Sequence, residues 1–569
     1  MRLELFSKII CGIFLAVICG LFYTQIIRGA FYYELSQKNR IRLIPQDGVR
    51  GNILDRNGKV LADSRLSFAV SVIPQEVENK DEAFGLLAGM LRIEKSSLMK
   101  AYKNGYAAPF APVLLKDNIT KNEALFLEEN KYRLGGIIVQ VKAQRRYPYG
   151  QEFSHSIGYL REVDKSRITR LKEYGYSLKD VMGYDGVEEA FDRYLRAEKG
   201  GMQIEVNNKG QMVRLLGLRL PHKGSDVTLT INADMQRIAY SALAQTRGCI
   251  IVIDPYSGAI LTMVSSPGYD PNVFAKNEKN EIKQLFNNSG SPMFNRVISA
   301  VYPPASLFKL ITATAALENR KISASTTFFC DGKMTIGNRE FKCWDKHGRV
   351  DFNKAVMYSC DIFFYQAGLL LGPQILSDYA FRFGLGRASG IDIEGEASGF
   401  VPTVNWKLWR RQESWFKGDT ANFAIGQGDL LVTPLQMVRL ISIFANGGYL
   451  IKPYLVESAA GNVSLDNRAG KKIGIKNEHL QILKQALSST VSGLEGTAHI
   501  LDMPGLRVAG KTGTAQVSRG LSHGWFIGFA PVNKPKIAFC VFIEHGGSSV
   551  VACTVARAML ERLLQENII

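Results

Sequence analysis

The chain has 569 residues, of which 46% are hydrophobic and 21% are charged, so it is long enough for two to four globular domains. Its 70 basic and 52 acidic residues give a net charge of +18, which predicts a polyanionic neighbourhood such as nucleic acid, anionic lipid or an acidic envelope polymer. The sequence has no basic run interleaved with aromatic residues and no nucleic-acid motif. We therefore exclude a nucleic-acid partner and prefer the cell envelope.

An apolar segment near the N-terminus predicts a membrane anchor. Nineteen uncharged residues run from Ile9 to Ile27, and as a helix they would span about 28 Å, close to the thickness of the hydrocarbon core. A cleaved signal peptide has a shorter apolar region and a small-residue exit, whereas this segment ends in Ile26-Ile27-Arg28. We expect residues 1–8 to form a cytoplasmic tip and residues 9–27 to form one retained transmembrane helix in the lipid bilayer.

Residues 28–221 are predicted to form an elongated α+β domain, here called the pedestal. Asn57-Gly58 lies between two short alternating runs, which predicts a β-hairpin with a type I′ turn. Asp55 and Arg56 have no nucleophile or metal ligand nearby in the sequence, so we interpret this hairpin as structural.

Residues 222–569 change in character and predict a second domain. Strands are expected first, helices follow, and strands return before a terminal helix from about residue 551; the expected strands are 226–231, 249–253, 259–264, 511–517, 525–530 and 537–543. One helix in the middle has a clear start at Thr433-Pro434 and a clear end at Asn446-Gly447. This order is typical of an α+β fold in which helices pack on a mostly antiparallel sheet.

A candidate nucleophile lies in the stretch from Val301 to Lys309. Pro303-Pro304 precedes an apolar periodic run, which predicts a helix with Ser306 in its first turn. Residues three apart share a helix face, so Lys309 could bring its amine to the Ser306 hydroxyl as a general base. The Ser-x-x-Lys pattern occurs three times in this chain, however, so it is weak evidence alone.

Two further motifs single out Ser306. Ser359-Cys360-Asp361 heads an apolar helical run, and Lys511-Thr512-Gly513-Thr514 begins a predicted strand. Ser-x-x-Lys, Ser-Asp-Asn and Lys-Thr-Gly in this order form the signature set of penicillin-binding proteins and class A β-lactamases. The chain therefore resembles the class B penicillin-binding proteins, and within them the elongation-type branch.

The resemblance runs from the anchor to the C-terminus. Family landmarks are matched by the hairpin at 50–62, Arg146-Tyr147-Pro148, Gly186-Val187-Glu188, Tyr302-Pro303-Pro304, Gly418-Asp419-Thr420, Ile425-Gly426-Gln427-Gly428 and Thr433-Pro434. It implies a transpeptidase fold: an antiparallel five-stranded sheet with helices on both faces and an all-helical subdomain, preceded by a dimerisation-type pedestal. A glycan-polymerising domain, which class A members carry, has no counterpart in the sequence.

The resemblance also implies the residues that do the chemistry. Ser306 would attack the carbonyl of the penultimate D-alanine of a stem peptide, Lys309 would take its proton, and Ser359 would relay a proton to the leaving group. Lys511 would hold the terminal carboxylate of the substrate. Asp361, Thr512, Gly513 and Thr514 would bind substrate, and the backbone N–H groups of Ser306 and Thr514 would form the oxyanion hole.

Three positions depart from the usual family pattern. Ala305 replaces a common glycine and Leu307 a common threonine, which are small local changes. Asp361 stands where many relatives have asparagine, and an ionised carboxylate would oppose the loss of a proton from Lys309. Within the family, an acid at this position resembles the pattern of the elongation-type branch.

Four residues are candidate metal ligands. Cys330, Cys343, His347 and Cys360 are the ligand types of a Cys₃His zinc site, although their spacing is not that of a zinc finger. The alternatives are a Cys330–Cys343 disulfide or three unlinked thiols. Acyl transfer itself requires no cofactor, so zinc would be structural.

The sequence thus predicts a serine-type D,D-transpeptidase that cross-links nascent peptidoglycan during side-wall elongation and binds β-lactams. It would sit in the inner membrane as a single-pass protein with a periplasmic catalytic domain, beside a glycan polymerase of the SEDS family and other elongation-complex membrane proteins. Three rivals stay open: a septal transpeptidase of the same class, a D,D-carboxypeptidase, and a non-catalytic β-lactam sensor or scaffold.

Overall fold

The structure is a computed structural model that describes residues 2–46, 48–106, 109, 112–164, 166, 173, 175–176, 180–206, 212–244, 246–461, 470–518 and 520–569. Contacts divide the chain into two compact units. The first holds Met1–Arg50, Ser64–Gln144 and Arg196–Gly224, and the second holds Gly51–Asp63, Arg145–Leu195 and Ser225–Ile569.

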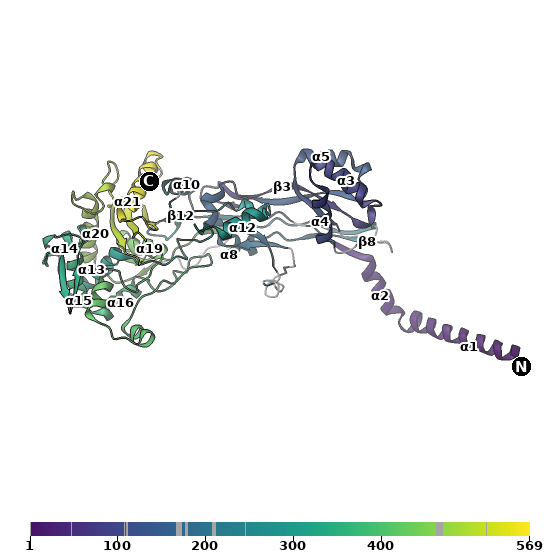
Figure 1. The fold of residues 1–569 in the computed structure, drawn as a ribbon, viewed down its shortest axis with the longest axis horizontal. Helices are drawn as coiled ribbons and strands as arrows, with labels where there is room; N and C mark the ends of the chain where they lie inside the picture. Colours follow the sequence, from purple (N-terminus) through teal and green to yellow (C-terminus); the bar gives the residue numbers. More distant parts are fainter. Residues whose placement is uncertain are drawn as a thin grey trace. The chain divides into compact units, whose positions relative to one another are not determined.

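The first unit begins with helix α1 (Arg2–Phe22), a π-helical turn (Tyr23–Ile27) and α2 (Gly29–Arg40), drawn in purple in Figure 1. Leu5–Ile27 has a mean hydropathy of 2.4 and contains the predicted span at 9–27. Among the described residues it is the one helix long and apolar enough to cross a membrane.

The rest of the first unit is an α+β assembly. Strands β1 (Ile41–Gln46), β8 (Gly200–Val206) and β9 (Met212–Arg219) form an antiparallel sheet. Part of β3 (Val60–Val72) pairs with β4 (Val113–Ile119), and β5 (Ile137–Arg146) also pairs with β3. The helices here are α3 (Lys80–Leu91), α4 (Lys95–Gly105) and α5 (Lys121–Glu129), and their apolar faces share one core around Phe84 and Leu98.

The predicted hairpin is present in the second unit, with β2 (Ile53–Leu54) paired to the start of β3. The predicted type I′ turn is wrong, because Gly58 has a φ of 81° whereas Asn57 is not among the described residues with positive φ. Asp55 is fully buried and accepts hydrogen bonds from the backbone N–H of Asn57 and Lys59, both at 2.8 Å. This confirms the structural reading of the hairpin.

A five-stranded antiparallel sheet lies at the centre of the second unit. Its order is β12 (Ile260–Ser266), β11 (Gly248–Ile253), β22 (Ile537–Ile543), β21 (His523–Ala530) and β20 (Ala509–Ala515). Every residue of β11, β12, β21 and β22 is buried, because both faces of the sheet are covered, and β11 and β22 accordingly read as continuous apolar runs. The predicted α+β fold is confirmed.

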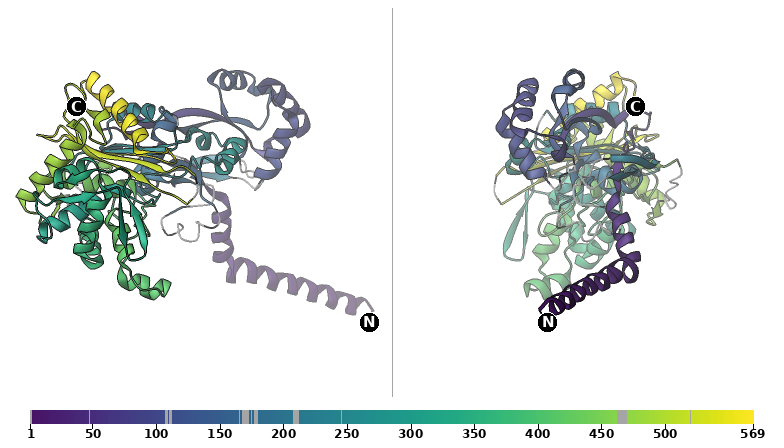
Figure 2. Two further views of the ribbon diagram at one scale, coloured as in Figure 1. Left: turned by 60° about the vertical axis from the view of Figure 1, so that its left-hand side comes forward. Right: turned by 90° about the vertical axis from the view of Figure 1, so that its right-hand side faces the viewer.

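Two hydrophobic cores cover the two faces of this sheet. On one face α10 (Ala233–Ala242) and α21 (Ser549–Gln565) pack with Ile250, Phe526 and Val541. On the other face α13 (Lys309–Glu318) and α19 (Pro434–Ala445) pack with Ile251, Ile527 and Phe542. The left-hand view of Figure 2 shows the yellow helix α21 on one side of the sheet and the teal and green helices on the other.

A helical subdomain completes this unit. Its helices are α14 (Phe352–Met357), α15 (Asp361–Leu371), α16 (Pro373–Arg382), α18 (Lys417–Ala424) and α20 (Asn477–Ser492). It also holds two short antiparallel strand pairs, β13–β16 (Phe328–Cys330, Gly348–Val350) and, between them in the chain, β14–β15 (Lys333–Ile336, Arg339–Lys342). Helix α19 begins and ends as predicted, because Thr433 and Gln436 form a capping box and Asn446 follows the last turn.

The remaining short elements of the second unit are β6 (Tyr159–Glu162), β7 (Val181–Tyr184), α6 (Ser154–Ile157), α8 (Gly186–Ala190), α9 (Asp192–Leu195), β10 (Val227–Leu229), α11 (Asn272–Ala275), α12 (Lys279–Asn287), α17 (Val404–Trp406), β17 (Tyr449–Leu450), β18 (Val456–Ala459) and β19 (Lys471–Lys472). Strand β10 lies between β2 and β18, outside the five-stranded sheet.

Candidate active site

Ser306 lies in a 3₁₀ turn, Ala305–Leu307, and helix α13 begins at Lys309. The helix was predicted to include Ser306 in its first turn, but it starts three residues later. The delay coincides with Ala305, whose φ of 49° lies in the left-handed region that a helical residue avoids. The turn leaves the Ser306 side chain half-buried at the start of an otherwise buried helix.

Glycines allow the backbone to approach this turn closely. The Ala305 N–H donates to the Gly426 carbonyl at 2.9 Å, and a Cβ on Gly426 would lie 2.1 Å from the Ala305 oxygen. A Cβ on Gly513 would lie 3.1 Å from both Leu307 Cγ and the Pro304 oxygen. Strand β20, which carries the Lys-Thr-Gly motif, therefore runs directly against the serine-bearing turn.

Lys309 connects the first motif to the second. Its side chain is 1% exposed, and its Nζ donates to the Ser359 carbonyl at 2.7 Å, to Ser359 Oγ at 3.2 Å and to Asp361 Oδ1 at 2.7 Å. We expected this amine beside the Ser306 hydroxyl. An ammonium has three N–H donors, and here all three are directed at Ser359 and Asp361. The Asp361 carboxylate therefore fixes the direction of the Lys309 amine.

A sharp turn presents the second motif. Ser359 has a φ of 55°, which is unusual for a residue with a side chain and is typical of functional sites. It stands between the end of α14 and the start of α15 at Asp361. The turn places Ser359 and Asp361 on Lys309, while the fully buried Cys360 between them belongs to the cysteine cluster described below.

The third motif supplies a second buried amine. Lys511 is 0% exposed, and burial, followed by the charge of Lys309, holds its pKa well below the ordinary value. The Thr512 hydroxyl donates to Thr497 Oγ1 at 2.8 Å. Thr514 is exposed, and its hydroxyl oxygen accepts a hydrogen bond from the Ser549 N–H at 3.1 Å. Of the site residues on β20, Thr514 is thus the most accessible.

Sequence reasoning missed a polar network behind the serine turn. The Tyr302 hydroxyl donates to Glu544, which also accepts from Arg296 Nε at 3.1 Å and pairs with Arg247 Nε at 3.0 Å. Tyr302 and Glu544 are 242 positions apart in the chain, and neither belongs to a motif with this spacing. The pairing of β11 with β22 brings Arg247 to Glu544, and the Tyr302 ring packs 4.2 Å from the Phe542 ring of β22, so no local signal could have found this network.

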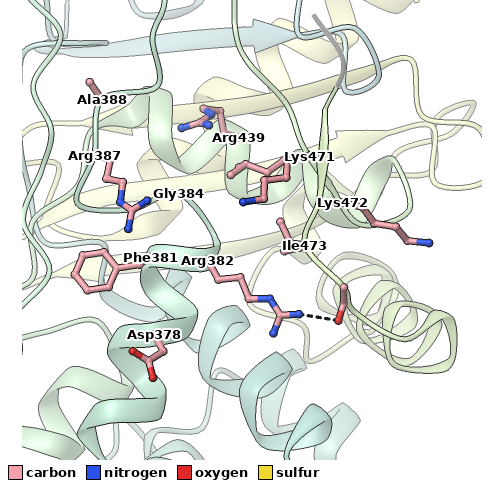
Figure 3. Close-up of a pocket in the computed structure, with 12 residues that line it drawn as sticks. Asp378, Phe381, Arg382, Gly384, Arg387, Ala388, Arg439, Lys471, Lys472 and Ile473 are labelled. Carbon is pink, nitrogen blue, oxygen red and sulfur yellow. Dashed lines mark hydrogen bonds between the residues drawn. The ribbon is translucent and has the colours of Figure 1, made fainter. Parts of the chain in front are cut away.

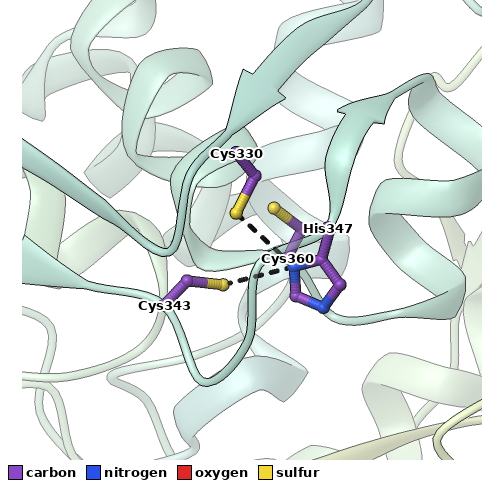
Figure 4. Close-up of side chains that lie close together, drawn as sticks. All are labelled: Cys330, Cys343, His347 and Cys360. Atoms are coloured by element: carbon purple, nitrogen blue, oxygen red, sulfur yellow. Dashed lines mark hydrogen bonds between the residues drawn. The ribbon is translucent and has the colours of Figure 1, made fainter.

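The four candidate metal ligands do come together. Their ligand atoms lie within 4.8 Å of one another, and the sulfurs of Cys330 and Cys343 are each 3.5 Å from His347 Nδ1. Figure 4 shows the three sulfur atoms and the His347 ring converging from β13, the following hairpins and the head of α15. All eight cysteines are described and are free thiols, so the Cys330–Cys343 disulfide is not formed in this structure.

The chemistry of this cluster suits a soft divalent metal. Three thiols and one imidazole nitrogen at mutual ligand distance match a tetrahedral Cys₃His zinc site. The hydrogen bond from Cys360 lowers the pKa of the Cys343 thiol, and the Asp361 N–H donates to the same sulfur at 3.3 Å. The donor set fits zinc, and Cys360 joins it to the Ser359 turn.

Residues 248–561 match the family described as penicillin binding protein transpeptidase domain, and residues 45–229 match the penicillin-binding protein dimerisation domain. The chain belongs to the penicillin-binding proteins. The transpeptidase match contains all three active-site motifs and the cysteine–histidine cluster.

Relatives extend the likeness over nearly the whole chain. Peptidoglycan D,D-transpeptidase MrdA of Escherichia coli is 31% identical over 96% of this chain and 91% of its own length, and the Haemophilus influenzae protein of that name is 32% identical over 96% and 88%. A complex of PBP2 with MreC from Helicobacter pylori has a TM-score of 0.83 at 27% identity, covering 93% of this chain and 99% of that one.

Together these findings make the protein a serine-type peptidoglycan D,D-transpeptidase of the elongation type. The predicted family and activity are confirmed.

Proposed function

We propose that Ser306 is the nucleophile of this penicillin-binding protein. Its Oγ attacks the carbonyl of the penultimate D-alanine of a stem peptide, the peptide bond breaks, and D-alanine leaves with a proton. An amine from a neighbouring stem then attacks the acyl-enzyme, forms the cross-link and releases Ser306. The observation that carries this proposal is the convergence of the Ser306 turn, the Lys309–Ser359–Asp361 cluster and strand β20.

Lys309 acts as the general base, and Ser359 relays the proton. The relay is supported by the 3.2 Å contact between Lys309 Nζ and Ser359 Oγ. A general base must be neutral before it accepts a proton, and the Lys309 Nζ lies 2.7 Å from Asp361 Oδ1. We infer that the buried Lys511 amine, whose pKa is lowered chiefly by burial, gains its charge when the substrate carboxylate binds beside it.

Strand β20 binds the substrate. It is an edge strand of the five-stranded sheet, so a peptide can pair with its open side. Gly513 lets this strand lie against the serine-bearing turn. Lys511, Thr512 and Thr514 hold the terminal carboxylate, with Asp361 completing the charge balance. The backbone N–H groups of Ser306 and Thr514 stabilise the oxyanion, a contribution typically worth about 3 kcal/mol per donor. β-Lactams take the place of the D-Ala-D-Ala terminus.

A structural zinc ion is proposed for the cysteine–histidine cluster. Cys330, Cys343, His347 and Cys360 would hold it, and it would fix the turn that carries Ser359. Metal analysis of protein purified without added zinc should find about one equivalent, and Cys330→Ser should lower it. Less than about a tenth of an equivalent in the wild-type protein would remove the proposal.

The protein is proposed to work in the inner membrane as part of the elongation complex. Leu5–Ile27 would anchor it, with the transpeptidase domain in the periplasm. The relative solved with MreC supports a membrane partner, and a similar structure from a peptidoglycan synthase complex supports a partner that polymerises glycan. We assign that second role to a SEDS-family polymerase.

The nucleophile is tested by intact mass after penicillin treatment. Wild-type protein should gain one penicillin mass, and Ser306→Ala should gain none. An equal adduct on Ser306→Ala would refute the assignment, as would its absence on the wild type. Product analysis with stem peptides and an acceptor amine should give cross-linked dimers; free D-alanine with only shortened monomers would instead indicate a carboxypeptidase.

A further inference from the structure

A pocket of about 590 Å³ opens in the transpeptidase domain away from the catalytic residues. It is bounded by the end of α16, the loop that follows it, α19 and the strands β17 and β19. None of its lining residues belongs to the three active-site motifs or to the cysteine–histidine cluster. Its volume lies within the range of small-molecule sites, about 300–1,000 Å³.

The lining of this pocket is strongly basic. Among the described residues, the pocket is lined by five cationic side chains and one carboxylate. The cations are Arg382, Arg387, Arg439, Lys471 and Lys472, and the carboxylate is Asp378. Figure 3 shows the guanidinium groups and the Lys471 amine gathered around the same space. Such a concentration of like charge is unfavourable unless an anion neutralises it.

Arg439 is the central group. It is 7% exposed on helix α19, and its Nε donates to the Ile451 carbonyl at 3.0 Å. No hydrogen-bond partner for its two terminal nitrogens is found among the described residues. Burial lowers its pKa to about 10, so it keeps its charge at neutral pH. The acid that acts on it electrostatically, Glu396, lies outside the lining and has its carboxylate on the N–H groups of Ser389 and Gly390.

The backbone and aromatic rings hold the other cations in place. Gly384 has a φ of 82°, and a Cβ there would come within 3.3 Å of Arg439 Nη1, so glycine leaves space beside the guanidinium. Arg382 donates to the Gly474 carbonyl at 3.0 Å and lies 5.2 Å from the Tyr379 ring, and Arg387 lies 5.6 Å from the Phe381 ring. The cations are therefore arranged before any ligand arrives.

We propose that this pocket binds a diphosphate-bearing small molecule. A guanidinium presents paired N–H donors that match phosphate oxygens, and a diphosphate places several negative charges in a small volume. One carboxylate would leave most of the five cations unbalanced. The same group can arrive as a free diphosphate or on an isoprenoid lipid, and the experiment distinguishes these sources. The site goes beyond the proposed acyl-transfer function and does not depend on it.

The test uses the full-length protein in phosphatidylcholine liposomes, titrated calorimetrically with inorganic pyrophosphate. Saturable binding is expected. Arg439→Gln should weaken it at least about tenfold, because charge-assisted hydrogen bonds are lost. The double change Arg387→Gln with Lys471→Gln should weaken pyrophosphate binding to a similar extent. Both of these side chains are exposed, so this variant keeps the test valid if Arg439→Gln fails to fold. Lys534→Gln, an exposed lysine outside the pocket, is the matched control.

The outcomes separate clearly. Liposomes doped with an isoprenyl diphosphate should displace pyrophosphate if the lipid form binds, and undoped liposomes should not. Citrate binding as tight as that of pyrophosphate would overturn the phosphate assignment. Equal weakening by Lys534→Gln, or no saturable binding from either source, would overturn the site. Penicillin acylation at the wild-type rate in the pocket variants shows intact folding, and it separates failure here from failure of the Ser306 assignment.

Discussion

Glu544 is predicted to hold the serine-bearing turn from behind, and Glu544→Gln tests this. Its carboxylate accepts hydrogen bonds from the Tyr302 hydroxyl and from the guanidinium of Arg296, whose side chain is 1% exposed. Glutamine has nearly the same shape, but it removes the charge and leaves Arg296 buried without a counter-ion. Breaking a buried pair in this way costs about 3–5 kcal/mol. The pair with Arg247, which is 48% exposed, adds less than about 1 kcal/mol.

Two measurements follow from this change. Unfolding of the full-length protein in denaturant should show the loss of stability, and the rate of acylation by a fluorescent penicillin should fall roughly tenfold or more, because Tyr302 begins the segment that leads to Ser306. Tyr302→Phe removes one hydrogen bond to a charged group and should cost about 2 kcal/mol. The double variant should cost less than the sum, because both changes act on one network.

The effect should also depend on pH. Burial alone would raise the pKa of Glu544, but the Tyr302 hydroxyl and the Arg296 guanidinium bring it below its ordinary 4.5. The unfolded chain therefore binds the proton more readily, so this contribution to stability is complete above pH 4.5 and is lost as the pH falls through the lower native pKa. Glu544→Gln should remove that part of the acid dependence.

A matched control is Glu340→Gln, which breaks an exposed pair with Lys333 and should leave stability within the measurement error of the wild type. If Glu544→Gln is as stable as the wild type within that margin and is acylated at the wild-type rate, the network does not position the turn.

Three further predictions concern single residues. Lys511→Met should abolish penicillin acylation yet raise the free energy of unfolding by roughly 1–3 kcal/mol at neutral pH, because burial lowers the pKa of Lys511. In pH-dependent unfolding this gain should shrink toward pH 10.5. A loss of stability in the variant would contradict the prediction. Gly426→Ala should cost roughly 3 kcal/mol and slow acylation, whereas Gly447→Ala, with an equally positive φ in open space, should cost about 1 kcal/mol and leave acylation intact. Thr433→Ala should lose the capping box of α19 and about 1 kcal/mol in thermal unfolding without changing acylation; a larger loss would mean that Thr433 does more than cap.

The sequence predicted elements whose signals are local. Strand β22 matches its predicted range of 537–543, because a continuous apolar run with β-branched and aromatic residues reports a doubly covered strand. Helix α19 was found from its cap and its terminal Asn-Gly. The order of the three motifs identified the family, and the residue types of the cysteine–histidine cluster were sufficient to propose a site that the structure brings together.

What the sequence could not predict depends on contacts between distant segments. The left-handed Ala305 that delays α13 is set by Gly426, over a hundred positions away, and the direction of the Lys309 amine is set by the Ser359 turn. Neighbouring residues do not carry this information. The predicted hairpin turn is wrong for a different reason. Asn57-Gly58 fits more than one turn type, and because Leu54 pairs with Val60 the loop is longer than the two residues of a type I′ turn.

The turn at Ser359 has a consequence for antibiotic resistance. Ser359 and Asp361 accept hydrogen bonds from Lys309, whereas Cys360, which lies between them, belongs to the cysteine–histidine cluster. A substitution at Cys330 or His347 touches neither Ser306 nor the strand proposed to bind the drug, yet it changes the support of Ser359, the residue proposed to relay the proton. We therefore expect variants with altered β-lactam response to include changes in this cluster.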